Sequence, residues 1–343
     1  MRPTLLFLAC LVLSPLLTAD ESARRFLQKP DSWFASTEAK KVAAIILSFQ
    51  TDAGGWPKNT DTISKAYSGD RAKLQPTFDN KATVDELRFM ARMFNATQDA
   101  TYRKSFDRGL AYVLSAQYAN GGWPQFFPLR KGYYDRITFN DGAMVRILQF
   151  VREVATEKTY AFLEPKTRAA CLKAFDLGIA CILKCQIIVG GKPTVWCAQH
   201  DEKTFAPAKA RSYELPSFSG SESVGIVRLL MSLEKPAPEI RASIEGAIAW
   251  FETHKVTGQR LETKKNLLGT PDLVMVPDAQ APALWARFYD LQTGAPYVCD
   301  RDGIPKATLA DIGHERRNGY SWFGEYARDL LATDYPKWKQ AHR

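Results

Sequence analysis

The stretch "ILSFQTDAGGWPKN" (residues 46–59) decides the fold, because the chain repeats it twice more. "VLSAQYANGGWPQF" begins at Val113, and "ILKCQIIVGGKPTV" begins at Ile182. Each copy starts with apolar residues, has a Gln four residues on, and has Gly-Gly four residues after the Gln. The starts lie 67 and 69 residues apart. Such a period indicates a chain built from repeated supersecondary units.

Each copy lies between two segments with helical periodicity. The segments before the Gly-Gly pairs are residues 37–49, 102–117 and 167–186, and those after them begin with "TFDNKAT", "TFNDGAM" and "SFSGSES". Their apolar residues recur at helical spacing, and strand signals are sparse. We therefore predict an all-α fold, an α/α toroid of about three helical hairpins with little β structure, in which the loops at one end converge. The tail after Gly294 is predicted to be irregular before a last helix near Trp322.

The composition and the N-terminus indicate an exported globular protein. The 343 residues are 45% apolar and 24% charged, as in soluble domains. Residues 1–19 read as a signal peptide, with Arg2, an apolar run and a small-residue cleavage site, which leaves one catalytic domain over residues 20–343. A lipoprotein reading would use Cys10, which comes too early in the apolar run. We expect a secreted or periplasmic location, and the pattern does not indicate an oligomeric state.

The charge pattern limits the classes of partner. Cleavage after residue 19 removes one basic residue, Arg2, and no acid, so the net charge falls from +9 to +8. The basic residues are spread along the chain, so a nucleic-acid-binding tail is not expected. No later segment is long and apolar enough to span a membrane. An acidic polysaccharide remains compatible with this charge.

The cysteines do not form a disulfide framework. Five remain after cleavage, an odd number over a long chain, and their spacing with histidine fits no zinc pattern. Cys181 and Cys185 share a helix face and are expected to be buried thiols. One bridge, for example Cys185 to Cys197, stays open.

The two Thr-Phe motifs carry the candidate metal ligands. "TFDN" supplies Asp79 and Asn80, and "TFND" supplies Asp141, each at the mouth of a predicted helix. Helix capping explains each residue singly. Converging loops would bring them together, and carboxylate and amide oxygens are the ligands that Ca²⁺ prefers. The set is too small for a closed cage, so water or a substrate carboxylate would complete it.

Charged and aromatic residues gather near the same end of the predicted hairpins. The third unit differs from the others through the segment "WCAQHDEKTFAPAKARSYELPSFSGSES" (residues 196–223), and arginines follow in "WARFY", "DRDG" and "ERRNG". Arginine grips carboxylates through two parallel hydrogen bonds. Trp56 and Trp123 would suit sugar faces or the core equally well.

Together these motifs make the chain resemble the pectate lyases of polysaccharide lyase family ten over nearly all of its mature length. The motifs are "GGWPKN", "TFDNKAT", "GGWPQFFP", "TFNDGAM", "WCAQHD", "ARSYELPSFSGSES", "DRDG" and "ERRNGYSW". The resemblance implies a three-hairpin α/α toroid. It also implies cleavage of polygalacturonate, or demethylated pectin, by Ca²⁺-assisted β-elimination, which gives unsaturated oligogalacturonides.

The resemblance also implies roles for single residues. Arg211 in "ARSYE" would be the base. Arg287 and Arg301 would hold substrate carboxylates. The Ca²⁺ and substrate region would comprise Asp79, Asn80 and Asp141, with Lys203 and Tyr213 as further substrate contacts and His200 and Glu222 as neighbours. "GGKP" replaces "GGWP" in the third unit, which removes a stacking role from that loop.

Three other functions fit parts of the pattern. An α/α toroid glycoside hydrolase acting on an acidic polysaccharide would use Asp79 and Asp141 as its acid and base. A terpenoid cyclase shares the "QTDAGGW" spacing, but the chain has no Asp-rich metal cluster to accompany it. A non-catalytic polysaccharide-binding protein would not need Arg211. An unsaturated product, which absorbs ultraviolet light, separates a lyase from all three.

Overall fold

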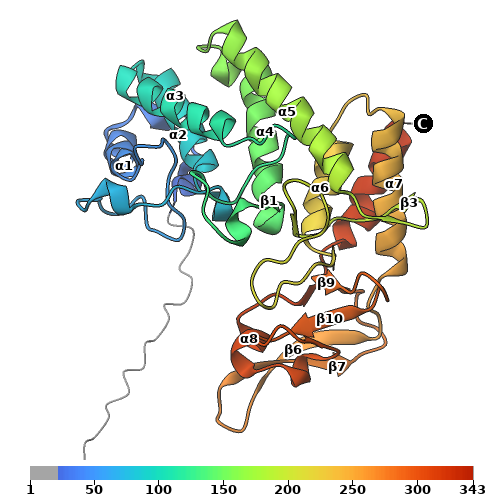
Figure 1. Ribbon diagram of the computed structural model, residues 1–343. Helices are drawn as coiled ribbons and strands as arrows, with labels where there is room; N and C mark the ends of the chain where they lie inside the picture. The colour runs from blue at the N-terminus through green and yellow to red at the C-terminus, as the bar shows by residue number, and fades with distance from the viewer. Residues whose placement is uncertain (1–21, 343) are drawn as a thin grey trace, which may run out of the picture.

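The computed structural model describes residues 22–342, so the predicted signal peptide, residues 1–19, lies outside the described part (Figure 1). The α-helices are α1 (Thr37–Ser48), α2 (Val84–Thr97), α3 (Ala100–Ser115), α4 (Ala143–Thr156), α5 (Pro165–Cys185), α6 (Glu222–Met231), α7 (Pro238–Thr253), α8 (His314–Asn318) and α9 (Tyr335–Ala341). Short helical turns that matter below are η4 (Asp79–Lys81) and η6 (Asn140–Gly142).

The strands are mostly two to four residues long. They are β1 (Ile137–Thr138), β2 (Ile188–Val189), β3 (Lys192–Pro193), β4 (Gln199–His200), β5 (Phe218–Ser219), β6 (Gln259–Lys265), β7 (Pro271–Pro277), β8 (Trp285–Ala286), β9 (Phe288–Tyr289), β10 (Pro296–Cys299), β11 (Pro305–Lys306) and β12 (Phe323–Gly324). The pairs are β1–β4, β2–β3, β6–β7 and β8–β12, and a four-stranded sheet has the order β11-β10-β9-β5.

The predicted helices are present and pack as hairpins. Helices α2, α4 and α6 lie in a row, with α4 in contact with both neighbours. Helix α3 packs on α2, α5 on α4, and α7 on α6, so each pair joins the helix after one Gly-Gly loop to the next helix along the chain. The row is open in Figure 1, with α1 to α3 at one side and α6 and α7 at the other. Apolar stripes such as Leu87, Met90, Ile147 and Leu148 are fully buried between the helices.

The glutamine of each repeat ties its loop to the second helix after it, which is α3, α5 or α7. Gln50 donates through Nε2 to the carbonyl oxygen of Gly54 at 2.8 Å and to that of Ser105 in α3 at 2.9 Å. The same pair of bonds is made by Gln117 to Gly121 and Ala174, and by Gln186 to Thr194 and Ser243. The repeat in the sequence is therefore a repeat in the structure, and the buried amide explains why Gln recurs.

The first two Gly-Gly loops need glycine because they press against a helix backbone. Gly121 has φ +93°, and a Cβ there would lie 2.0 Å from the carbonyl oxygen of Leu177. Gly54, with φ +107°, would bring a Cβ within 2.5 Å of the Arg108 carbonyl oxygen. In the third unit Gly190 and Gly191 have open space around them and form the β2–β3 turn instead.

The tryptophans of these loops belong to the core. Trp56 and Trp123 are fully buried, and their indole N–H groups donate to the carbonyls of Ile46 and Val113 at 2.8 and 2.9 Å. Trp196 makes the equivalent bond to Ile182 at 2.7 Å. The third unit thus keeps its tryptophan at a later position, and the stacking of sugars on Trp56 or Trp123 is ruled out by burial.

The prediction of an all-α toroid is wrong, because much of the segment 256–324 is β structure. Strands β6 and β7 pair antiparallel over seven residues each, from Gln259 opposite Pro277 to Lys265 opposite Pro271. The region predicted to be irregular contains β10 and β11, and β12 lies near Trp322, where the sequence predicts a last helix; the last helix is α9. A separate apolar cluster around Phe288, Val298 and Trp322 supports these strands. Most of them are too short to leave an alternating pattern in the sequence.

Two further predictions concern cysteines and membranes. All five cysteines of the described chain are buried free thiols, so Cys185 and Cys197 are not bridged. Within residues 22–342, no helix has the length and apolar character needed to cross a bilayer.

Candidate functional site

The two Thr-Phe motifs place their acid and amide in different environments. After Phe78 and Phe139, the first position is buried: Asp79 is 3% exposed and Asn140 is 5% exposed. The second position, Asn80 or Asp141, has left-handed backbone angles, with φ of 48° and 49°. Asn and Asp tolerate this conformation better than other side chains. The swapped order therefore puts one carboxylate inside and the other, Asp141, at the surface.

The backbone beside Asp79 is strained. Thr83 has φ 73° and ψ −50°, which is an outlier for a β-branched residue. Its hydroxyl accepts from the Trp56 N–H at 2.9 Å and donates to the Thr77 carbonyl at 2.9 Å. These bonds hold a conformation that costs about 1–3 kcal/mol in isolation. Strain of this kind concentrates at functional sites.

Asp79 is held by two residues that occupy the same place in successive repeats. Lys58 follows the first Gly-Gly-Trp-Pro, and its ammonium binds Oδ2 of Asp79. Gln125 follows the second, and its Nε2 donates to the same oxygen at 2.7 Å. Oδ1 accepts from the Asn80 N–H at 2.9 Å. The buried carboxylate is thus charge-compensated and fixed in orientation.

Arg287 joins the second Thr-Phe motif to Glu222, which lies in "SFSGSES", the corresponding segment of the third unit. Its Nη2 donates to Glu222 Oε1 at 2.5 Å, to Asp141 Oδ1 at 3.1 Å and to Asn140 Oδ1 at 3.2 Å. The Arg287 side chain is 9% exposed and that of Glu222 is 2% exposed. Burial alone would lower the pKa of Arg287, but the charges of Glu222 and Asp141 outweigh it and raise the pKa. Arg287 is therefore a permanent cation beside the exposed carboxylate of Asp141.

Arg211 is clamped by Glu214. Its Nε donates to Glu214 Oε2 at 2.8 Å and its Nη2 to Oε1 at 2.5 Å. Burial works to lower the pKa of Arg211, and the ion pair with Glu214 more than reverses this, so the pKa is raised. Burial works to raise the pKa of Glu214, whereas Arg211 lowers it and prevails. The pair is charged and geometrically fixed.

Tyr320 connects Arg211 with Arg287. Its hydroxyl donates to Glu214 Oε1 at 2.7 Å. The guanidinium carbons of Arg287, Arg211 and Arg316 lie 4.8, 5.6 and 5.9 Å from its ring centroid. Cations are attracted to the face of an aromatic ring. One tyrosine thus gathers three guanidinium groups.

The first motif lies next to the second. The turns η4 and η6 contact each other, and η4 also contacts α4. Arg146, in the first turn of α4, is subject to the charges of Asp85, Asp141 and Asp79, although burial prevails and lowers its pKa. Its buried Nε has no hydrogen-bond partner in the described chain.

Other predicted contacts are placed as follows. Tyr213 is 4% exposed, and its ring supports the guanidinium groups of Arg211 at 5.2 Å and Arg316 at 4.7 Å. Its buried ring supports the arginines, and its role as a substrate contact stays a prediction. Arg301 is exposed and pairs with Glu315, which also binds Arg316.

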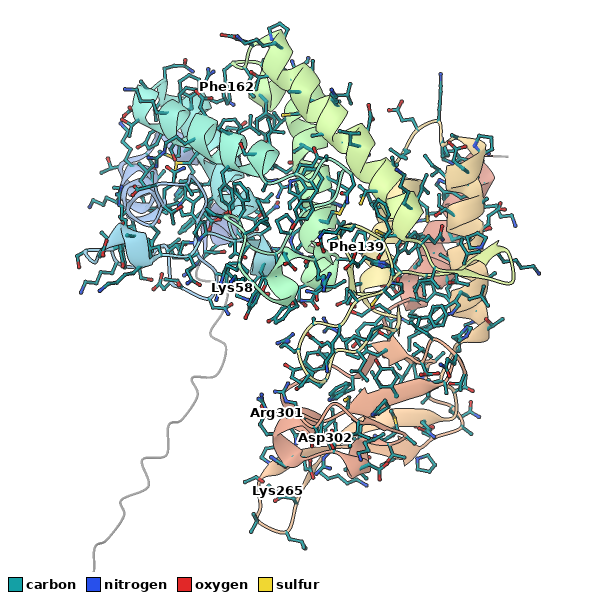
Figure 2. All side chains as sticks on the ribbon, viewed as in Figure 1. Lys58, Phe139, Phe162, Lys265, Arg301 and Asp302 are labelled. Atoms are coloured by element: carbon teal, nitrogen blue, oxygen red, sulfur yellow. The ribbon has the colours of Figure 1, made fainter. Side chains whose placement is uncertain are left out.

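Lys203 is exposed, and within the described residues no ion pair or side-chain hydrogen bond links it to this group. Figure 2 shows Lys58 at the edge of the helical part and Arg301 at the edge of the β-rich part, on the same side of the molecule.

The side-chain oxygens of Asp79 and Asp141 fit a cation whose remaining ligands come from an anionic substrate. Among residues 22–342, no group of three or more His, Cys, Asp or Glu side chains forms a self-sufficient metal site. Asp79 and Asp141 are already paired with Lys58 and Arg287. A carboxylate has about four lone-pair sites, so each retains oxygen capacity for a hard cation such as Ca²⁺. The negative charge of a further anion at this place would favour binding of the cation.

Sequence reasoning missed four members of this site: Lys58, Gln125, Arg146 and Tyr320. The first two had a detectable signal, because they occupy the same position after Gly-Gly-Trp-Pro in two repeats. Tyr320 lies inside the quoted "ERRNGYSW", but only the fold brings its ring under three arginines.

Comparisons with known proteins agree with this geometry. The model of the family described as pectic acid lyase matches residues 50–331. A family 10 polysaccharide lyase from Cellvibrio cellulosa is 32% identical with a TM-score of 0.78, over 95% of this chain and 99% of that one. A mutant of the Cellvibrio cellulosa family 10 enzyme, in complex with trigalaturonic acid, is 32% identical with a TM-score of 0.77, over 92% of this chain and 97% of that one. No match was found among curated proteins.

Proposed function

Because the chain belongs to the pectic acid lyase family and is a polysaccharide lyase, we propose that it cleaves polygalacturonate by Ca²⁺-assisted β-elimination with Arg211 as the base. The products would be unsaturated oligogalacturonides. The observation that carries the proposal is the chain of contacts from Asp141 through Arg287 and Tyr320 to Arg211. The family excludes the glycoside hydrolase alternative, and the related enzyme bound to trigalaturonic acid supports a galacturonate substrate.

The arginines suit the charge that develops in the reaction. β-Elimination removes a proton from the carbon beside a uronate carboxylate, and negative charge builds up on that carboxylate in the transition state. Fixed cations near this charge lower the barrier without reorganising. Arg287, held by Glu222 and Asp141, and the exposed Arg301 are the residues that we propose to hold substrate carboxylates.

Glu214 and Tyr320 position the proposed base. Glu214 engages Nε and Nη2 of Arg211, and Nη1 has no hydrogen-bond partner in the described chain. To accept the proton, Arg211 must first be neutral. Its pKa is raised above the ordinary value of an arginine because Glu214 outweighs burial. The neutral fraction therefore grows about tenfold for each pH unit, and we expect turnover to rise steeply with alkaline pH.

Asp79, Asn80 and Asp141 are the residues that we propose to hold Ca²⁺ together with a substrate carboxylate. When bound, the ion would withdraw charge from that carboxylate and make the neighbouring proton more acidic. The present residues contribute before any ion binds, because Lys58 and Gln125 fix Asp79 in its orientation. We also propose export, after removal of residues 1–19, with the mature N-terminus near Asp20.

The test is the product formed from polygalacturonate. The purified protein should release material with the ultraviolet absorption of an unsaturated uronide. Arg211→Ala should lower turnover by at least about a thousandfold, the range for loss of a proton-transfer group together with its charge, while polygalacturonate still binds. Near wild-type turnover in Arg211→Ala would remove Arg211 as the base and leave the lyase activity standing.

A further inference from the structure

Aromatic rings and cations lie along the loop of residues 126–134, which reaches from the surroundings of Asp79 to those of Arg211. Phe126 begins it: its backbone pairs with Thr77, and Lys58 lies 5.5 Å over its ring. Tyr134 meets Phe126 edge-on at 5.2 Å, and Tyr133 packs against Tyr134 at 4.1 Å. The charges of Arg211 and Glu214 in turn act on the Tyr133 hydroxyl. The loop therefore spans from one part of the proposed site to the other.

Arg130 is the arginine at the tip of this loop, and among the described residues it has no counter-charge. Its guanidinium carbon lies 4.9 Å from the Phe126 centroid and 4.6 Å from the Tyr134 centroid. Its one polar bond runs from Nη1 to Gln75 Oε1, at 2.7 Å. Within the described residues it forms no ion pair, whereas Arg211 and Arg287 both bind carboxylates. Two rings thus hold a half-exposed guanidinium with free donors.

We propose that Arg130 and Tyr133 form a binding subsite for a galacturonate unit that lies away from the bond being cleaved. Arg130 would pair with the carboxylate of that unit through its free N–H donors. The half-buried Tyr133 would pack against the sugar ring. The inference rests on the proposed function, because it assumes a polyanionic galacturonate chain. Such a subsite would make the protein bind long galacturonate chains better than short ones.

The packing of Arg130 between two rings favours a binding role over that of an arginine that is merely solvated. Arginine has about 2 kcal/mol of rotamer freedom to lose on binding, and the two rings have already restricted it. The neighbouring Lys58 is unsuited to the same task because Asp79 neutralises it. A carboxylate that pairs with a partly exposed, preorganised guanidinium gains enough to change affinity about three- to tenfold.

Kinetics on substrates of two lengths test the subsite. Arg130→Gln should raise KM for a hexagalacturonate about three- to tenfold and leave kcat unchanged. Both constants for a trigalacturonate should stay within about twofold of wild type. Arg130→Lys keeps the charge and should recover part of the affinity for the long substrate.

Arg152→Gln is the matched control. Arg152 also lies over a ring, that of Phe175 at 5.5 Å, but it is about 14 Å along α4 from Ala143, the end of the helix that follows Asp141. The control should not change either substrate's KM. Equal kinetics of Arg130→Gln and wild type on both lengths, or an equal loss on both, would overturn the subsite.

A binding assay separates this inference from the proposed function. Affinity electrophoresis in polygalacturonate measures retention without turnover, and Arg130→Gln should be retained less than wild type and Arg152→Gln. If wild type forms no unsaturated product, the lyase proposal fails while this comparison still decides the subsite. If product forms but retention is identical in all three proteins, the subsite fails and the lyase proposal stands.

Discussion

The buried pair of Arg287 and Glu222 gives the sharpest quantitative prediction. The two side chains are 9% and 2% exposed, and Arg287 Nη2 lies 2.5 Å from Glu222 Oε1. Arg287→Met would leave the Glu222 carboxylate with Ser219 as its remaining side-chain partner. Removing one member of a buried ion pair costs about 3–5 kcal/mol in the free energy of unfolding, because an uncompensated charge remains. For a chain of this length, the melting temperature should fall by roughly 4–8 °C.

A double-mutant cycle tests the physical reason. In Arg287→Met combined with Glu222→Gln the uncompensated charge is gone, so most of the loss should return, with a coupling energy of about 2–3 kcal/mol. Urea unfolding of the four proteins measures it. Arg301→Met is the control, because that arginine and its partner Glu315 are 65% and 61% exposed, and exposed pairs contribute about 1 kcal/mol or less. A loss below about 1 kcal/mol in Arg287→Met, or purely additive effects, would refute the argument.

Four other predictions concern pH, metal and the loops. Glu214→Gln removes the charge that raises the pKa of Arg211, so the alkaline rise in turnover should move to lower pH; an unmoved profile would contradict an Arg211 base. A chelator such as EDTA should abolish turnover of polygalacturonate and Ca²⁺ should restore it; full activity in EDTA would remove the metal from the proposal. Burial lowers the pKa of His200 from 6.5 to about 4. As the pH falls, the unfolded chain therefore binds this proton before the folded chain does. The free energy of unfolding should then fall by about 3 kcal/mol between pH 6.5 and 4, and acid titration of His200→Gln should show a smaller fall. Gly121→Ala adds a Cβ 2.0 Å from a carbonyl oxygen and should cost more than 2 kcal/mol by denaturant unfolding, whereas Gly191→Ala, with open space, should cost about 1.

The repeat made the helical half of the fold predictable. Gln50, Gln117 and Gln186 each donate to a carbonyl of their own loop, so a local pattern in the sequence corresponds to a local pattern of hydrogen bonds. Helix formation depends on contacts within one turn and on an apolar stripe, and both are visible in a single segment. The β-rich part depends on pairing between distant strands of two to seven residues, such as β5 with β9, which a segment read alone does not reveal.

The candidate site, like the fold, has features that the sequence indicates and features that only the structure shows. The sequence by itself singled out the two acid-amide motifs, because they recur at corresponding places in two repeats, and the resemblance to family ten pointed to Arg211 and Arg287. Only the tertiary structure decided that Asp79 is buried against Lys58 whereas Asp141 is exposed beside Arg287. The same holds for Tyr320, whose ring lies under three arginines. Residue type sets what a side chain can bond, but the pairing of charges depends on which segments the fold brings within a few ångströms, and that is settled by packing over the whole chain.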